Sequence, residues 1–210
     1  MIKALILAAL PVLPCLAAAA DVQADSMRSE PGHASLAADR ACSGDQLASP
    51  AGCQLGWGEL GFTLQASASG SLNRLLIQPA GLSVDNSTIN ADLDGSAYGA
   101  VLADLDGNGW PGIYVYVSSA GSGSYGSLAA YAVNNGKSIT PVYLPPLDQS
   151  PQALDGYMGH DRFAVAGDYL VRRFPVYLPG DSNAAPTGGT RELRYRLVPG
   201  EAGWVLLLLP

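Results

Sequence analysis

Three oxygen-bearing side chains recur at alternate positions in the segment DLDGNGWPG. Asp104, Asp106 and Asn108 occupy its first, third and fifth positions, and Gly109 occupies the sixth. This is the spacing of the first half of an EF-hand loop, in which side-chain oxygens converge on Ca²⁺ while the glycine allows a sharp bend. The segment is therefore one candidate for a calcium site.

The second half of such a loop is missing. Gly112 stands at the ninth position and Val115 at the twelfth, where an EF-hand has a bidentate glutamate. A shorter echo, NADLDG, places Asp92 and Asp94 twelve residues earlier. Both segments also suit turns in which a side-chain oxygen accepts a nearby backbone N–H. The pattern favours turns and leaves a calcium-binding or adhesion-type β module as the alternative.

Groups suited to catalysis are sparse. The chain has two histidines, His33 and His160, and the second stands beside Asp161. A lone histidine next to an aspartate predicts a local hydrogen-bonded pair rather than a general base. The sequence contains no G-x-S-x-G motif, and pairing of Cys42 with Cys53 would leave no free thiol in the mature chain. We therefore predict a protein that binds a partner, is not an enzyme and needs no cofactor.

A serine- and glycine-rich segment, SSAGSGSYGS at 118–127, lies between two apolar segments. Its glycines make it thin enough to enter a groove, and Ser122, Ser124 and Tyr125 supply hydroxyl donors. The tyrosine also offers a large ring with little side-chain entropy to lose. Composition alone favours an ordinary flexible surface loop, so a binding role needs support from elsewhere.

Short apolar or alternating segments separated by turn residues fill the chain after Gly56. In RELRYRLV at 191–198, Leu and Tyr alternate with charged residues, which indicates a strand with one buried face. Asn134-Asn135-Gly136 and Gly167-Asp168 have the composition of hairpin turns. The pattern predicts an all-β fold, an antiparallel β-sandwich or barrel-like packed sheets in a single domain. Strands are expected near residues 59–66, 73–78, 97–103, 113–119, 128–133, 138–144, 162–165, 169–177, 191–198 and 204–209.

The N-terminus has the features of an export signal. Lys3 gives a short positive start, an apolar run follows, and Ala18-Ala19-Ala20 offers a cleavage site. We expect a signal peptide at 1–20, a flexible tail at 21–41 and a folded domain at 42–210.

A periplasmic location follows from this signal. The apolar run is too short and too interrupted by proline to span a membrane. Lipid attachment at Cys15 is an alternative that the preceding Pro14 disfavours. In an oxidising compartment, Cys42 and Cys53, eleven positions apart, are spaced for a local disulfide.

The charge of the chain excludes one class of partner. The formal net charge is −7 and the chain has two lysines, so no basic surface for nucleic acid is expected. An acidic face could attract a basic partner, although such a charge is also typical of a protein that is merely soluble.

Around the serine-rich loop, the chain resembles the periplasmic inhibitors of invertebrate-type lysozyme. Ser122-Gly123-Ser124-Tyr125 matches the Ser-Gly-x-Tyr inhibitory motif of that family. The resemblance continues through DLDGNGWPGIYVYVSSAGSGSYGSLAAY, GYMGHDRFAV and LVRRFPVYLPGDSNAAPTGG, within residues 97–204. Four residues alone have little specificity, but their position between these longer segments makes the match more specific.

The resemblance implies a β-sandwich-like domain that inserts its motif loop into the active-site cleft of an invertebrate-type lysozyme. Bacterial peptidoglycan would thereby be protected from a host defence. A lysozyme cleft contains a catalytic acid and a second carboxylate, which hydroxyl groups can engage. A second contact region is expected in PGDSNAAPTGGTR, with Asp181, Asn183 and Arg191, for which a structural connection is the alternative. The oligomeric state stays open, and a homodimer is one option.

Overall fold

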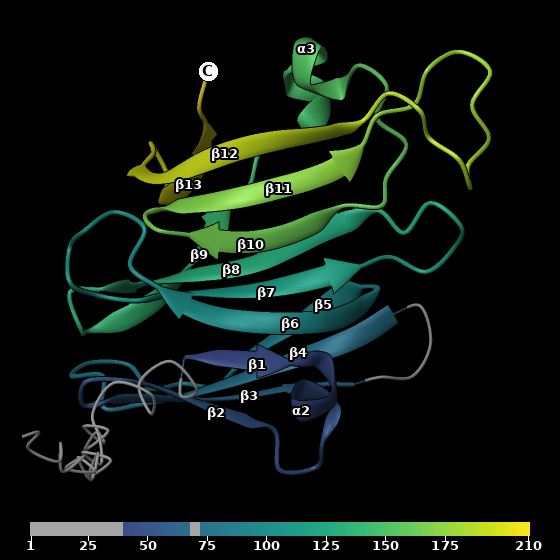
Figure 1. Cartoon of the computed structure of the whole chain (residues 1–210). Helices are drawn as coiled ribbons and strands as arrows, with labels where there is room; N and C mark the ends of the chain where they lie inside the picture. The colour runs from purple at the N-terminus through teal and green to yellow at the C-terminus, as the bar shows by residue number, and fades with distance from the viewer. Residues whose placement is uncertain (1–39, 68–71) are drawn as a thin grey trace, which may run out of the picture. The chain divides into compact units, whose positions relative to one another are not determined.

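Two β-sheets account for most of the structure (Figure 1). In this computed structural model the described residues are 40–67 and 72–210, all within the unit Gly32–Pro210. The expected signal peptide, His33 and nearly all of the expected tail lie outside the described residues. The first strand already begins at Ala41, one residue before the predicted start of the domain.

The larger sheet has nine strands and curls into a half-barrel (Figure 1). In spatial order they are β1 (Ala41–Ser43), β6 (Ser96–Ala103), β7 (Gly112–Ser118), β8 (Gly126–Asn134), β9 (Ser138–Tyr143), β13 (Trp204–Leu208), β12 (Thr190–Pro199), β11 (Tyr169–Pro175) and β10 (Arg162–Ala166). Neighbouring strands are antiparallel except β9 and β13, which are parallel over a short stretch.

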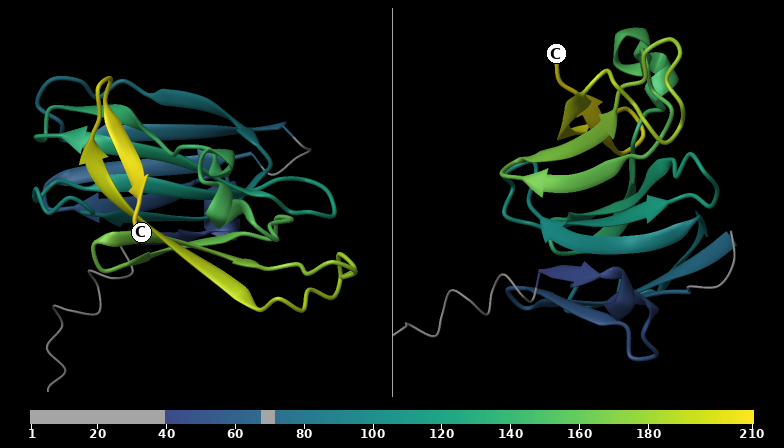
Figure 2. Two further views of the ribbon diagram at one scale, coloured as in Figure 1. Left: turned by 90° about the horizontal axis from the view of Figure 1, so that it is seen from above. Right: turned by 45° about the vertical axis from the view of Figure 1, so that its right-hand side comes forward.

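The smaller sheet is antiparallel and has four strands, β2 (Cys53–Trp57), β3 (Leu60–Ala66), β4 (Leu72–Ala80) and β5 (Ile89–Asp94). Every second residue of β3 is buried, as expected for a strand with one face on a core. Phe62 and Leu64 of this sheet share a core with Ile113 and Val115 of the larger sheet, so the two sheets form packed layers (Figure 2). A disulfide joins Cys42 of β1 to Cys53 of β2 and so links the two sheets covalently.

A second core lies within the half-barrel. It contains Tyr114, Leu170, Tyr195 and Leu206, all nearly or completely buried. The curl also brings β10 back towards β6, because the backbone N–H of Phe163 donates to the Tyr98 hydroxyl at 2.8 Å. β6 and β10 are not neighbours in the sheet, so this hydrogen bond to the Tyr98 side chain joins two strands that do not pair through their backbones.

Helical structure is limited to α2 (Gly44–Ala48), the 3₁₀ turn η1 (Leu147–Gln149) and α3 (Pro151–Leu154) within the described residues. Ser43 and Gln46 form a capping box at the start of α2. None of the helices in residues 40–67 and 72–210 has the length and apolarity needed to cross a membrane.

The predicted all-β, mainly antiparallel fold is confirmed, and each of the ten predicted strands is present with small shifts at its ends. Strands β1, β2 and β5 were not predicted. The expected turn at Asp92 and Asp94 is wrong, because both residues belong to β5. Along this edge strand they pair with Arg74 and Leu72 of β4.

Candidate interaction site

The serine-rich segment forms the loop between β7 and β8. Its stem is closed by the pairing of Ser118 with Gly126 and by a 2.8 Å hydrogen bond from the Ser119 N–H to the Tyr125 carbonyl. Its tip is tightened by a 3.3 Å bond from the Ser124 N–H to the Gly121 carbonyl. We call residues 119–125 the motif loop. It extends beyond the end of the sheet (Figure 1).

A second segment, just before β10, holds the motif loop at two points. The His160 N–H donates to the Gly123 carbonyl at 2.7 Å. The Asp161 carboxylate accepts the Gly126 N–H at 2.8 Å. These bonds lie on either side of Ser124 and Tyr125 in the chain, so the backbone of both residues is fixed from outside the loop.

Glycines make this contact possible. A Cβ at Gly159 would lie 2.2 Å from the Gly123 carbonyl oxygen, and one at Gly126 would lie 2.4 Å from the Asp161 Cβ. A Cβ at Gly123 would lie 2.5 Å from the Tyr125 ring. Each separation is shorter than a Cβ contact allows, so the backbone approach of Gly159 to Gly123 requires glycine, and a side chain at Gly126 or Gly123 would displace Asp161 or the Tyr125 ring.

Tyr125 is half-exposed, at 49%, and is not part of the core. Its ring packs edge-on against Tyr157, with the ring centroids 5.7 Å apart. Ser122 is exposed, whereas the Ser124 hydroxyl donates weakly to the Gly121 carbonyl at 3.4 Å. Within the described part of the chain, the hydroxyls of Ser122 and Tyr125 make no hydrogen bond, so both can bond to a partner.

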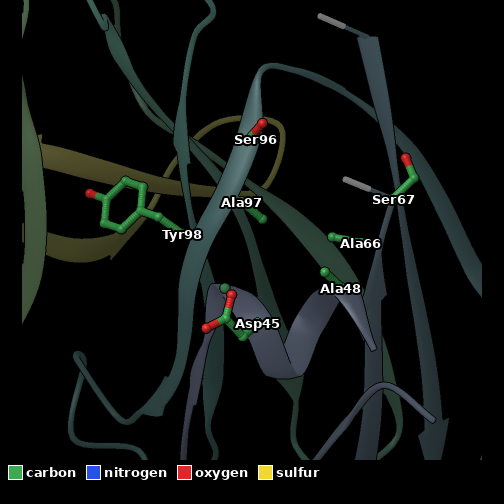
Figure 3. A pocket seen from close by; sticks show the side chains of 8 residues that line it. Asp45, Ala48, Ala66, Ser67, Ser96, Ala97 and Tyr98 are labelled. Carbon is green, nitrogen blue, oxygen red and sulfur yellow. The ribbon is translucent and has the colours of Figure 1, made fainter. Parts of the chain in front are cut away.

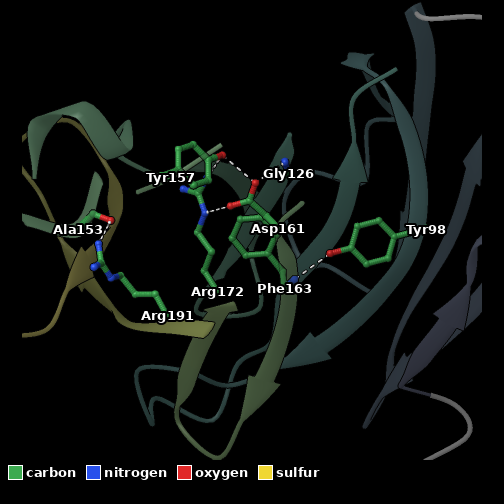
Figure 4. A network of polar contacts seen from close by, with 8 residues as sticks. All are labelled: Tyr98, Gly126, Ala153, Tyr157, Asp161, Phe163, Arg172 and Arg191. Carbon is green, nitrogen blue, oxygen red and sulfur yellow. Dashed lines mark hydrogen bonds and ion pairs between the residues drawn. The ribbon is translucent and has the colours of Figure 1, made fainter. Parts of the chain in front are cut away.

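A buried ion pair between Asp161 and Arg172 lies next to Gly126, the residue that follows the motif loop (Figure 4). Asp161 has no exposed surface, and its Oδ1 accepts the Arg172 Nε–H at 2.5 Å. The Tyr157 hydroxyl donates to Asp161 Oδ2 at 2.7 Å and accepts from Arg172 Nη2 at 2.9 Å. Burial, followed by the hydrogen bond to Asp161, raises the pKa of the Tyr157 phenol. All three groups are committed to one another, so they anchor the loop and do not face a partner.

The predicted His160–Asp161 hydrogen-bonded pair is wrong. The His160 ring contacts Asn183, with 3.3 Å between Nε2 and Oδ1, and Asp161 instead pairs with Arg172. His160 has a φ of 58°, outside the strand region, and the two side chains turn to different partners.

The loop between β11 and β12 provides a third segment, and Asn183 reaches the motif loop from it. The Asn183 Nδ2 donates to the Ser122 carbonyl at 3.0 Å. Asp181 stabilises this loop internally, because its carboxylate accepts the Leu178 N–H at 2.7 Å and the Thr187 N–H and hydroxyl at 2.8 Å each. Three hydrogen bonds lower the pKa of the Asp181 carboxyl: those from the backbone N–H groups of Thr187 and Leu178, and that from the Thr187 hydroxyl.

Arg191, the third residue of the expected second contact region, is occupied elsewhere. One of its guanidinium nitrogens donates to the carbonyls of Gln152, Ala153 and Asp155, around the end of α3 (Figure 4). Of the three residues expected there, the structure brings Asn183 to the motif loop and gives Asp181 and Arg191 contacts within the protein. Sequence reasoning did not single out Tyr157, and it assigned no role to Arg172.

The DLDGNG segment forms a turn, as its composition favoured. The Asp104 carboxylate accepts the backbone N–H groups of Gly107, Asn108 and Gly109 at 2.8–3.1 Å. Asn108 donates to Asp106 and accepts the Trp110 N–H. Burial, then contact with Asp104, raises the pKa of Asp106. Residues 40–67 and 72–210 contain no group of three His, Cys, Asp or Glu side chains placed to hold a metal ion.

A hollow of about 380 Å³ lies between α2, β3 and β6 (Figure 3). Among the described residues that line it, Asp45 is the one charged residue and most of the others are small. The Tyr98 hydroxyl at its margin already accepts the Phe163 N–H. The hollow therefore lacks the converging polar groups of a ligand site, and the motif loop remains the candidate site.

Comparisons with protein-family models, with curated proteins and with solved structures found no match.

Proposed function

We propose that this protein inhibits an invertebrate-type lysozyme by inserting its motif loop into the active-site cleft of the enzyme. The observation that carries the proposal is the state of the loop: its backbone is held from two other segments, while the exposed residues Ser122 and Tyr125 have hydroxyls that bond to nothing in residues 40–67 and 72–210. The Ser-Gly-x-Tyr resemblance supports the choice of partner.

The chemistry of the cleft suits these groups. Glycosidases of this kind place two carboxyl groups around the scissile bond. Hydroxyl groups of Ser122 and Tyr125 can donate to such carboxylates, and each charge-assisted hydrogen bond stabilises a complex by about 1.5–3 kcal/mol. A loop that is already ordered loses little entropy on binding. An inhibitor of this kind would act in the periplasm, between the incoming enzyme and the peptidoglycan.

The test is an inhibition titration with the purified mature protein against lysozymes of the invertebrate type and of other classes. We expect stoichiometric inhibition of the invertebrate-type enzyme. Ser122→Ala combined with Tyr125→Ala should weaken inhibition by about 100-fold or more, because two charge-assisted hydrogen bonds are lost.

Ser127→Ala is the matched control, since Ser127 is an exposed serine at the start of β8 that is outside the motif loop. This variant should inhibit like the wild type. An unchanged inhibition constant in the double variant would exclude the motif loop from the mechanism, and the absence of inhibition by the wild type would reject the proposal.

A further inference from the structure

We propose that Asn183 and His160 are positioning residues, which fix the orientation of the motif loop and thereby set its affinity for the partner. This inference rests on the proposed inhibitory function. Neither residue needs to contact the enzyme's carboxylates to act in this way. Their role is to bind the loop backbone, so that the hydroxyls of Ser122 and Tyr125 are presented in one arrangement.

Two successive carbonyl groups of the motif loop are held from different segments. The Ser122 carbonyl accepts the Asn183 side-chain N–H, and the Gly123 carbonyl accepts the His160 backbone N–H. A peptide with both carbonyls fixed cannot rotate freely, which matters in a loop with glycines at positions 121 and 123. The direction of the Ser122 side chain follows from this restraint.

The hydrogen bond from Asn183 to Ser122 also determines which group donates and which accepts in the contact between Asn183 and His160. Because the Asn183 Nδ2 donates to Ser122, its Oδ1 is the acceptor that faces His160 Nε2, 3.3 Å away. His160 Nε2 must therefore carry a hydrogen. The result is a chain of donors that runs from the imidazole through the amide to the loop carbonyl.

Two further features support a positioning role. His160 has a φ of 58°, an unfavourable conformation for a residue with a side chain. Such strain persists where the surroundings impose it and clusters at functional sites. Tyr177 also supports both residues, because its ring stacks on the His160 ring and its hydroxyl donates to the Asn183 carbonyl at 3.0 Å.

The experiment compares Asn183→Asp, Asn183→Ala and His160→Gly with Asn90→Ala, a control at an exposed asparagine of β5. Asp at position 183 keeps an acceptor for His160 but loses the donor to Ser122. His160→Gly keeps the backbone N–H, relieves the positive φ and loses the ring. Amide hydrogen exchange reports on loop order without any enzyme, read at Ser124, which bonds to Gly121 within the loop tip, and at position 160, which bonds to the Gly123 carbonyl.

We expect exchange at these two amides to rise about five-fold in each of the three variants, the size expected for one lost hydrogen bond. The inhibition constant should weaken by about the same factor, and in the two Asn183 variants the melting temperature should change little because Asn183 is exposed. The control should match the wild type in all three measurements.

The outcomes separate the inference from the function on which it rests. Unchanged exchange in Asn183→Asp would overturn the positioning role, whatever the enzyme assay gives. Faster exchange with unchanged inhibition would also overturn it, while loss of inhibition in the Ser122/Tyr125 double variant would keep the proposed function intact. If the wild type does not inhibit, the function fails and the inference fails with it.

Discussion

The Asp161 carboxylate accepts the Gly126 backbone N–H at 2.8 Å, although Asp161 has no exposed surface. A buried acid thus fixes the residue that follows the motif loop. The charge of this acid is balanced by Arg172, itself 6% exposed. Burial of two charges is expensive even when they are paired, so such a pair is better explained by the geometry it imposes than by the stability it adds.

Asp161→Asn tests this arrangement. The amide can still accept the Gly126 N–H, but the Arg172 charge is left buried without a counter-charge. We expect the free energy of unfolding to fall by about 3–5 kcal/mol, measured by urea denaturation. Glu192→Gln is the control, because Glu192 pairs with Arg173 at the surface, where an ion pair contributes little to stability. Equal effects of the two substitutions would show that the buried pair has no special role.

The approach of Gly159 to Gly123 predicts a steric effect. A methyl group at Gly159, where φ is +93°, would meet the Gly123 carbonyl oxygen, whereas one at Gly167, where φ is +63°, would meet nothing within 4 Å. Gly167→Ala should therefore cost about 1 kcal/mol from backbone conformation alone. Gly159→Ala should cost a further 1–3 kcal/mol or so, because backbone atoms must move. The melting temperatures of both variants test this difference, and equal decreases would contradict the close contact between Gly159 and Gly123.

The prediction of the fold from sequence succeeded where local patterns determine structure. Strand β3 alternates regularly, and the turn at Asn135 and Gly136 has the positive φ angles that its composition indicated. Strand β5 was missed because its sequence, INADLD, is rich in residues that strands usually lack. Its pairing with β4 overrides the local preference.

The anchor of the candidate site depends on contacts that no local pattern reveals. Asp161 meets Arg172 because β10 and β11 pair in a register that places Phe163 opposite Arg172. Spacing alone does not set this register, so the adjacent His160 looked like the natural partner. Asn183 reaches the motif loop from 61 positions along the chain. The motif was visible in the sequence, whereas the segments that hold it depend on the folded topology.

We expect loss of the disulfide between Cys42 and Cys53 to destabilise the fold locally, at β1. Strand β1 has three residues and, among the described strands, pairs with β6 alone, so the link to β2 is a major part of its attachment. By loop-closure entropy, removing the link should lower stability by about 3 kcal/mol. In a Cys42→Ala, Cys53→Ala variant, amide exchange should rise first in β1. Exchange that rises equally across β7 and β8 would contradict a local effect.

We expect a buried tyrosine, Tyr114, and a partly buried one, Tyr157, to respond differently to loss of the hydroxyl. The Tyr114 hydroxyl is buried and has no hydrogen-bond partner in the described part of the chain, and burial raises its pKa. Tyr114→Phe should leave stability unchanged or raise it by up to about 1 kcal/mol. Tyr157→Phe removes bonds to Asp161 and Arg172 and should cost about 1–3 kcal/mol. Denaturant midpoints compare the two, and destabilisation of both would reveal a partner for Tyr114.

We expect the loop between β11 and β12, which contains Asp181, to lose stability at acidic pH. Hydrogen bonds from Thr187 and Leu178 hold the pKa of its carboxyl below the ordinary value of 3.8. A lowered pKa means that the ionised form stabilises the folded loop, so the contribution is complete above pH 3.8 and is lost as the pH falls through the lower folded value. The amide shifts of Thr187 and Leu178, followed from about pH 6 to about pH 2, should report this transition. In Asp181→Asn the same amides should show no such transition. If they titrate alike in both proteins, another acid controls the loop that carries Asn183.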